Sequence, residues 1–187
     1  MSESYKFPNQ FIDTQFVPYM KKEEIESLVD SLADTVSKRY ENRELVVLGV
    51  LKGASNFVAD LVRKVRRVDM VIDFIKVCDL GRTRVHGGTI RIEKDIKVDI
   101  RDKDVLIVED IVESARTLAF IKKRLELASP KSLEILTLFD RPFDRNEEIA
   151  IDYIGKTVKE KFIVGLGLDL EGYGRNLENI YYLKYPN

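Results

Sequence analysis

The amino-acid sequence predicts an α/β protein with a mostly parallel, twisted β-sheet flanked by helices. Two patterns support this fold class. Continuous apolar runs of strand length recur along the chain, and stretches with the apolar spacing of amphipathic helices separate them. Strands that alternate with helices form βαβ units, in which the strands are parallel. A sheet of this kind binds its ligands beyond the carboxyl ends of its strands, so we expect the functional residues there.

The elements follow one another with clear changes of pattern. Residues 1–20 are expected to be irregular, although their aromatic side chains suggest that they pack onto the body of the protein. Apolar residues at helical spacing then predict an amphipathic helix at 22–40. The further expected elements are a strand at 45–51, a helix at 57–65, a strand at 68–77, half of an exposed hairpin arm at 89–96, a strand at 104–110, a helix at 114–127, and strands at 132–140 and 161–169.

The composition limits the possible functions. The chain has 187 residues, with 31 Lys and Arg against 32 Asp and Glu. This length suits one domain, and the balanced charge gives no basic excess for binding nucleic acid. One cysteine and one histidine exclude a disulfide framework and a Cys/His zinc site. Because no apolar window could span a membrane and the polar first ten residues lack a signal-peptide core, we expect a cytoplasmic protein without membrane or nucleic-acid partners.

The strongest functional signal follows the strand at 104–110. Glu109 and Asp110 are adjacent carboxylates where this strand leaves the core, and Glu113 comes three residues later. Carboxylates at such a place could hold Mg²⁺ or accept hydrogen bonds from sugar hydroxyls. The helix that follows opens with Ser114, Ala115, Arg116 and Thr117. Its free N–H groups and positive dipole end suit a phosphate, so the segment favours a phosphosugar site over a plain capped helix start.

A lysine beside a glycine, Lys52 and Gly53, ends the first core strand. The chain contains neither GxxxxGK[ST] nor GxGxxG, so Walker-type ATP hydrolysis and dinucleotide binding lack sequence support. The amine and exposed backbone N–H groups at this turn could still hold a phosphate. A solvated lysine at a tight turn is the alternative interpretation.

These motifs resemble a known family. Residues 105–118 resemble the 5-phosphoribosyl-1-diphosphate (PRPP) signature of the type I phosphoribosyltransferases, because apolar, acidic and hydroxyl positions agree in order. LGVLKGASNFVADL, TLFDRP and KFIVGLGLDLEGYGRNL resemble the corresponding segments of the hypoxanthine-guanine branch. The resemblance spans about residues 45–184 and implies the fold of that family. The implied organisation is a single phosphoribosyltransferase domain, with a core at about 22–160 and a small hood formed by the terminal segments 1–21 and 161–187.

The resemblance also implies an activity and a role for each matching residue. The activity is transfer of the phosphoribosyl group from PRPP to hypoxanthine or guanine, with Mg²⁺ as cofactor and a homodimer or homotetramer as the assembly. Pyrophosphate would bind to Lys52, Gly53 and Arg175, often across a non-proline cis peptide bond. Ribose and its phosphate would bind to Glu109, Asp110, Ser114, Ala115, Arg116 and Thr117, with Glu113 as the catalytic proton acceptor. The purine would bind to Arg141, Phe162, Ile163 and Asp169, and the metal to Glu109, Asp110 and Asp169.

Four positions depart from the pattern of the family. Glu113 stands where the family has Asp, and a shift of about 1 Å in a catalytic group can cost ~100-fold in rate. Arg141 stands where it has Lys, and the two cations are not interchangeable. Ala115 replaces the more common Gly, as in some members of the family. Residues 78–81, Cys-Asp-Leu-Gly, stand where the mobile catalytic loop has a Ser-Tyr pair.

These departures leave two alternatives open. One is a catalytically weak or inactive PRPP-fold regulator that senses nucleotides. The other is an enzyme that prefers xanthine, because Arg141 could favour another oxo-purine. The remaining reactive residues are expected to be unremarkable, with His86 in an exposed loop and Cys78 as a packed small residue at a strand end.

Overall fold

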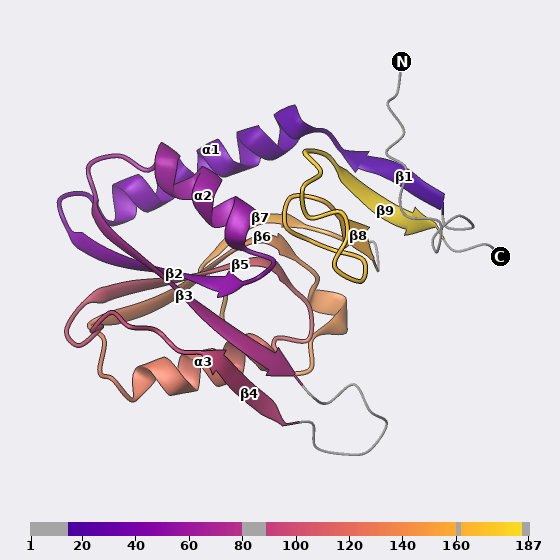
Figure 1. Cartoon of the computed structure of the whole chain (residues 1–187). Helices are drawn as coiled ribbons and strands as arrows, with labels where there is room; N and C mark the ends of the chain where they lie inside the picture. The colour runs from indigo at the N-terminus through magenta and orange to yellow at the C-terminus, as the bar shows by residue number, and fades with distance from the viewer. Residues whose placement is uncertain (1–14, 80–88, 160–161, 185–187) are drawn as a thin grey trace.

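The structure is a computed structural model that describes residues 15–79, 89–159 and 162–184. Its largest element is a six-stranded sheet (Figure 1). In spatial order the strands of this sheet are β4 (Ile90–Lys94), β3 (Asp69–Asp79), β2 (Glu44–Leu51), β5 (Asp104–Val112), β6 (Ser132–Asp140) and β7 (Tyr153–Thr157). All neighbouring strands are parallel except β4, which runs antiparallel to β3 at the edge. The predicted α/β class with a mostly parallel sheet is therefore confirmed.

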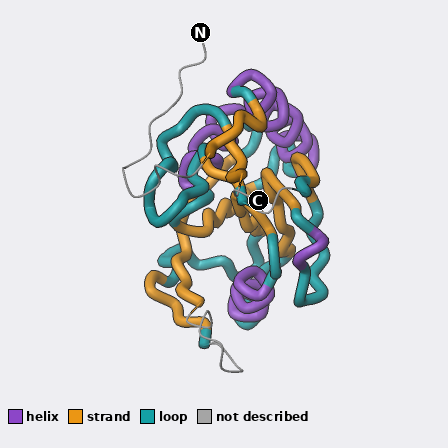
Figure 2. The backbone as a smooth tube through the Cα atoms, turned by 90° about the vertical axis from the view of Figure 1, so that its right-hand side faces the viewer, coloured by secondary structure: helices purple, strands orange, loops and turns teal. Residues whose placement is uncertain are grey.

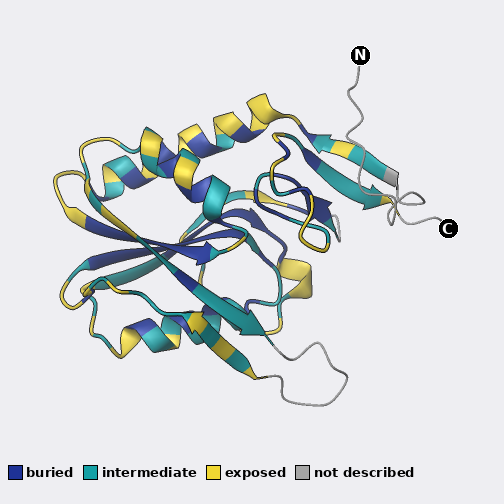
Figure 3. Cartoon of the chain, viewed as in Figure 1, coloured by how far each residue is buried: buried dark blue, intermediate teal, exposed yellow. Residues whose placement is uncertain are grey.

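Helices cover both faces of this sheet. Helices α1 (Lys22–Arg39) and α2 (Ser55–Lys64) lie on one face and α3 (Arg116–Glu126) on the other, as Figures 1 and 2 show. Successive side chains of a strand point to opposite faces, so Val47 packs in the core beneath α1 and α2, while Val46 and Leu48 pack in the core beneath α3. Burial on both faces explains why β2 and β5 are continuous apolar runs in the sequence (Figure 3).

A second, three-stranded antiparallel sheet lies beside the carboxyl ends of the large sheet (Figure 1). It consists of β1 (Gln15–Met20), β9 (Ile180–Lys184) and β8 (Ile163–Val164), in that order. The pairing of β1 with β9 joins segments from opposite ends of the chain, with Phe16 opposite Leu183. This small sheet carries the loop 165–179 over the edge of the large one.

A polar cluster anchors the far end of α1 to the large sheet. The carboxylate of Glu134 on β6 accepts hydrogen bonds from Arg39 Nη2 (2.5 Å), Tyr40 Oη (2.7 Å) and Tyr153 Oη (2.5 Å). Burial raises the pKa of Glu134, but these hydrogen bonds outweigh burial and hold the pKa below its usual value. Burial and the contact with Glu134 raise the pKa of Tyr153 to about 12.

The structure corrects the sequence-based prediction at three places. The strand expected at 161–169 is only the two-residue β8, and it belongs to the small sheet, because Gly165, Leu166 and Gly167 have positive φ angles of 124°, 47° and 99° that end an extended strand. Residues 15–20, expected to be irregular, form β1. The edge strand β7 was not predicted. The other helices and core strands lie close to their expected positions, and none of the described helices is long and apolar enough to cross a membrane.

Candidate functional site

A cavity of about 460 Å³ lies where the carboxyl ends of β2, β3 and β5 face the small sheet and its loop. It collects nine predicted site residues from distant parts of the chain. These are Gly53, Glu109, Asp110, Glu113, Thr117, Phe162, Ile163, Asp169 and Arg175. A second cavity of about 170 Å³ adjoins it, shares Glu109, Glu113 and Thr117, and adds Ser114 and Ala115. Of the remaining predicted residues, Lys52 is exposed, Arg116 lies at the start of α3, and Arg141 forms ion pairs described below.

The acidic pair at the end of β5 is buried. Glu109 and Asp110 are only 8% and 7% exposed. Burial, followed by repulsion from Asp110, raises the pKa of Glu109 well above its usual value. Burial also raises the pKa of Asp110, although hydrogen bonds and the charge of Arg175 oppose that shift. Two buried carboxylates side by side are costly to ionise together, and a bound cation or hydrogen-bond donors would stabilise their charged forms.

Glycines permit three segments to meet beside this pair. The peptide bond between Leu51 and Lys52 is cis, and Gly53 follows it. A Cβ atom at residue 53 would overlap the carboxylate of Asp110, and a Cβ atom at residue 167 would overlap the carbonyl oxygen of Gly53. The loop after β2 is therefore enclosed between the end of β5 and the loop after β8, with no space for a side chain at either glycine.

The loop 165–179 carries a second charged pair into the cavity. Arg175 Nη2 lies 2.5 Å from Asp169 Oδ1, and Arg175 Nη1 donates to the carbonyl oxygen of Gly167 at 2.6 Å. Asn56 on α2 donates to the carbonyl oxygen of Arg175 at 2.7 Å. The backbone N–H of Gly172 donates to Asp169 Oδ2 at 2.5 Å. Both side chains of the pair are thus held in place within the loop 165–179.

The segment between β5 and α3 forms an open cradle of backbone groups. Ala115 precedes the first residue of α3 in a left-handed conformation, with φ 63°. The carbonyl oxygen of Ser114 accepts hydrogen bonds from the backbone N–H groups of Asn146 (3.1 Å) and Glu147 (3.2 Å). At the start of α3, Arg116 Nη1 lies 3.6 Å from Asp79 Oδ2 at the end of β3. The start of a helix with its free N–H groups suits a phosphate.

Arg141 lies between two carboxylates. Its Nη2 is 2.5 Å from Glu113 Oε1, and its Nε is 2.7 Å from Asp144 Oδ2 at the end of the short 3₁₀ helix η2 (Pro142–Asp144). The arginine is buried, with 7% of its surface exposed. Glu113 and Arg141, two of the four positions at which the sequence departs from the family pattern, are therefore direct partners.

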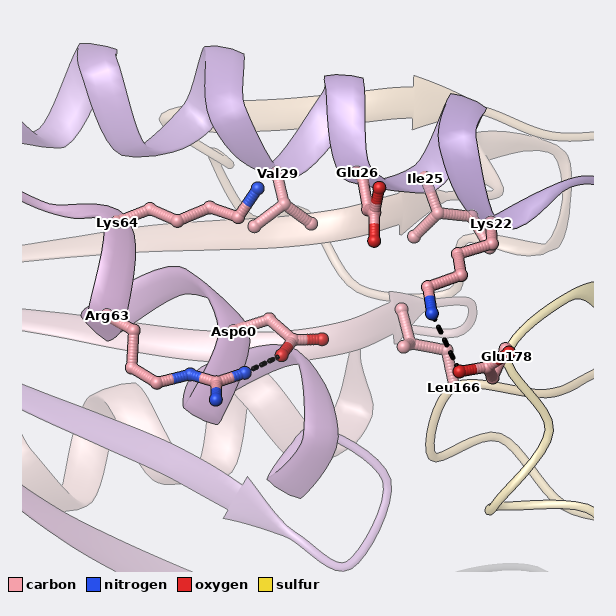
Figure 4. Close-up of a pocket in the computed structure, with 9 residues that line it drawn as sticks. All are labelled: Lys22, Ile25, Glu26, Val29, Asp60, Arg63, Lys64, Leu166 and Glu178. Carbon is pink, nitrogen blue, oxygen red and sulfur yellow. Dashed lines mark hydrogen bonds and ion pairs between the residues drawn. The ribbon is translucent and has the colours of Figure 1, made fainter.

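Some predictions fall outside these cavities or outside the described residues. Cys78 is half-buried on β3 opposite Arg91 of β4, whereas Leu80, Gly81 and His86 lie outside the residues that the structure describes. A third cavity of about 340 Å³, between α1, α2 and the loop 165–179, contains no predicted site residue. Four of its charged side chains form two ion pairs, Lys22 with Glu178 and Arg63 with Asp60 (Figure 4).

Sequence reasoning missed three residues that shape the site. Asn56 holds the backbone of Arg175, Gly167 permits the close contact with Gly53, and Asp144 holds Arg141. The GLG sequence at 165–167 was a usable signal, because two glycines within a strand pattern indicate a break or a close backbone approach. The sequence contains no comparable signal for Asn56 or Asp144.

The residues present fit a magnesium ion shared with a substrate. Glu109 and Asp110 supply the hard carboxylate oxygens that Mg²⁺ prefers, and a cation would offset the burial and mutual repulsion that disfavour their charged forms. Within the described residues no group of three or more His, Cys, Asp and Glu could hold a metal by itself. An ion held by these two carboxylates would take its other oxygens from water and substrate phosphates.

Comparison with known proteins gives a consistent result. The sequence profile of the phosphoribosyl transferase domain matches residues 19–171. A hypoxanthine-guanine phosphoribosyltransferase of Staphylococcus aureus is 38% identical over 170 residues, which cover 88% of this chain and 92% of that protein. The bifunctional protein TilS/HprT of Listeria monocytogenes is 37% identical over 165 residues, or 88% of this chain, and the chain spans only 25% of the length of that relative.

Solved structures agree with the sequence matches. A hypoxanthine phosphoribosyltransferase from Staphylococcus aureus superimposes with a TM-score of 0.86 at 35% identity, covering 98% of this chain and 100% of the other. A hypoxanthine-guanine phosphoribosyltransferase from Bacillus anthracis has a TM-score of 0.83 at 35% identity, covering 90% and 98%. The match therefore includes the small sheet as well as the large one. The chain belongs to the phosphoribosyltransferase domain family and, within it, to the hypoxanthine-guanine phosphoribosyltransferases.

Proposed function

We propose that this chain transfers the 5-phosphoribosyl group of PRPP to hypoxanthine or guanine, forming IMP or GMP and releasing pyrophosphate, and so serves purine salvage. One observation carries the proposal. A single cavity brings together the acidic pair of β5, the helix start at α3 and the charged loop after β8, which are the groups that such a reaction needs. The names of the Staphylococcus aureus and Bacillus anthracis relatives support the same activity.

Under this proposal the larger cavity and the smaller cavity beside it provide three binding regions. The 5′-phosphate of PRPP occupies the smaller cavity, where Ser114, Ala115 and Thr117 and the N-terminus of α3 surround it, with Arg116 nearby. The ribose hydroxyls donate to Glu109 and Asp110. Pyrophosphate lies against Gly53 and Arg175, with Lys52 as a further cation.

The purine lies on the opposite side of the larger cavity. Phe162 stacks on its ring, and the backbone groups of Ile163 and Asp169 read its edge. Glu113, which borders both cavities, lies between the purine and the phosphate cradle and is the proton acceptor. As the bond between ribose C1 and the pyrophosphate oxygen breaks, a purine nitrogen bonds to C1, and the proton of the purine passes to the carboxylate of Glu113.

Electrostatic stabilisation of the leaving pyrophosphate and alignment of base and sugar would accelerate the transfer. Negative charge develops on the departing pyrophosphate, and the guanidinium of Arg175, held by Asp169 and Gly167, is already oriented to receive it. Fixed positions for base and sugar remove part of the entropic barrier. Mg²⁺ bound by Glu109 and Asp110, with Asp169 beside a second ion, would neutralise phosphate charge. The proposal also includes the cytoplasm as the location, a single domain over 1–187, and a homodimer or homotetramer as the assembly.

A transferase assay with four different bases tests the proposal. Purified protein is given PRPP and Mg²⁺ with hypoxanthine, guanine, xanthine or adenine in turn, and pyrophosphate release and nucleotide formation are followed together. Release with hypoxanthine or guanine is the expected result, and preferential release with xanthine would change the base. If no base gives release, the transferase proposal is wrong, and tight PRPP or nucleotide binding in the same samples would favour the regulator.

A further inference from the structure

Glu113 and Arg141 lie side by side, because each directly follows the end of one of two neighbouring parallel strands. Strands β5 and β6 pair with Val112 opposite Asp140, and Glu113 and Arg141 are the next residues on each strand. The backbone N–H of Arg141 donates to the carbonyl oxygen of Val112 at 2.9 Å, which fixes the two chains together at this point. The ion pair between the two side chains, 2.5 Å from Nη2 to Oε1, therefore follows from the strand register.

A second carboxylate fixes the guanidinium from its other end. Asp144 Oδ2 lies 2.7 Å from Arg141 Nε. The short helix η2 brings Asp144 back toward Arg141, and the N–H of Asp144 donates to the carbonyl oxygen of Arg141 at 3.3 Å. The carboxylates of Glu113 and Asp144 thus place negative charge beside Nη2 and Nε of one guanidinium, an extended cation that a point-like ammonium group would not replace.

Glu113 faces the substrate, whereas Arg141 lies behind it. Glu113 borders both cavities of the site, and its side chain is 44% exposed. The side chain of Arg141 is only 9% exposed. Arg141 is not one of the described residues that line these two cavities. A purine in the larger cavity would thus meet the carboxylate of Glu113, with the paired guanidinium behind it.

We infer that Arg141 is a positioning residue that acts through Glu113, and that Asp144 supports it, so that Arg141 is not itself a contact of the purine. The inference rests on the proposed transferase function. Glutamate has one more rotatable bond than aspartate, and its carboxylate needs an external contact to stay in one place. The arginine supplies that contact, because its rigid fork is held by Asp144 and pairs with Glu113. The two departures from the family pattern thereby form one unit.

This role differs measurably from a direct contact with the base. If Arg141 only positions Glu113, its removal lowers kcat and leaves the KM for the base nearly unchanged, because the base loses no partner. Its removal also has no further effect once Glu113 is an amide, because there is no proton acceptor left to position. A direct contact with the base would instead raise the KM for the base, and its loss would add to the loss of Glu113.

A double-mutant cycle tests the inference. Wild type, Arg141→Met, Glu113→Gln and the double variant are compared for kcat and for the KM of hypoxanthine and of PRPP. We expect Arg141→Met to lower kcat by roughly 10- to 100-fold with both KM values within about threefold, and the double variant to match Glu113→Gln within about twofold. Glu148→Gln, which alters an exposed acid four residues after Asp144, is the control and is expected to match wild type.

A second, milder variant keeps the inference testable if Arg141→Met does not fold. Asp144→Asn leaves the Glu113–Arg141 pair intact and removes only its support, so kcat should fall by several-fold with the KM of hypoxanthine unchanged. Additive losses in the cycle, or a raised KM for hypoxanthine with unchanged kcat in either variant, would overturn the inference while leaving the transferase function in place. Absence of turnover in the wild-type protein with every base would remove the proposed function and, with it, this inference.

Discussion

The α-carbon of Gly53 lies against the carboxylate of Asp110, so close that a Cβ atom at residue 53 would overlap Oδ2. The loop that follows β2 and the acid that ends β5 are thus in direct contact across the large sheet. On its other side the same glycine meets Gly167 from the loop after β8. This stack connects the acidic pair to Arg175, which donates to the carbonyl oxygen of Gly167.

Replacing Gly53 with alanine tests the importance of that contact. The added methyl group must displace either the loop or Asp110, and a shift of about 1 Å in a reacting group can cost ~100-fold in rate. We therefore expect Gly53→Ala to lower the rate of pyrophosphate release by ~100-fold, measured with saturating PRPP and hypoxanthine. Ala59→Ser, on the exposed side of α2, is the matched control. A wild-type rate in Gly53→Ala would show that the close contact is not needed.

Asp110→Asn removes one charge of the acidic pair without changing its shape. Turnover is expected to fall by at least ~100-fold, because the amide cannot hold a cation as the carboxylate can. The fold should remain intact, because burial already disfavours the charged form of this group and raises its pKa. Initial rates and urea unfolding on the same samples measure the two effects. Unchanged turnover in this variant would remove the proposed role of the pair.

Arg175→Lys keeps the charge of the loop and loses its geometry. The arginine contacts Asp169 and the carbonyl oxygen of Gly167 at once, which the single ammonium group of lysine would not reproduce. We expect kcat/KM for PRPP to fall by roughly 10- to 100-fold. Arg124→Lys, in an ion pair with Asp95 away from the site, is the control for the same exchange. Equal kcat/KM values for the two lysine variants would contradict the prediction.

Ala115 tests the backbone of the phosphate cradle. Its φ of 63° is natural for glycine and costs an L-residue about 1–2 kcal/mol. Glycine would relieve this cost but lose a buried methyl group worth roughly 0.8 kcal/mol, so the unfolding free energy of Ala115→Gly should stay within about 1 kcal/mol of wild type. Ala115→Val, which adds a β-branch, should be destabilised by about 2 kcal/mol or more. Urea unfolding compares the three proteins, and equal stability of the valine variant would count against the strained conformation.

The cluster around Glu134 predicts a dependence of stability on pH. Its pKa in the folded protein is lower than the usual 4.5, so the folded state binds fewer protons than the unfolded state near that pH. Glu134 therefore stabilises the fold above its usual pKa, and this contribution is lost as pH falls through the lower, folded pKa. Glu134→Gln should lower the unfolding free energy at neutral pH by roughly 1–3 kcal/mol, with a smaller difference in acid. A difference that does not change with pH would contradict this assignment.

Local patterns predicted most of the large sheet. Strands β2, β5 and β6 are apolar runs because both of their faces are buried, and a run of that kind is visible in the sequence without knowledge of its neighbours. The edge strand β7 is short, half exposed and interrupted by Gly155, so its sequence resembles a loop. The pairing of β1 with β9 brings together residues from opposite ends of the chain, and no local pattern indicates that partnership.

The candidate site divides in the same way. The places of Glu109, Asp110 and Thr117 at the cavity could be predicted from their order, because the strand, the acids and the helix start are adjacent in the sequence. The ion pair of Glu113 with Arg141 could not, since it depends on the register between β5 and β6. The contact of Gly53 with Asp110 likewise depends on the closeness of two backbones, which a sequence does not record.

The pairing of β1 with β9 has a consequence for the order in which the protein is completed during synthesis. A ribosome makes β9 after every strand of the large sheet, and domains begin to fold from their N-terminal parts while synthesis continues. The nascent chain can therefore assemble β2, β5 and the acidic pair while β1 still waits for its partner. Arg175 and β9 follow the acidic pair in the sequence, so the loop 165–179 can close over the end of β5 only after β9 has emerged.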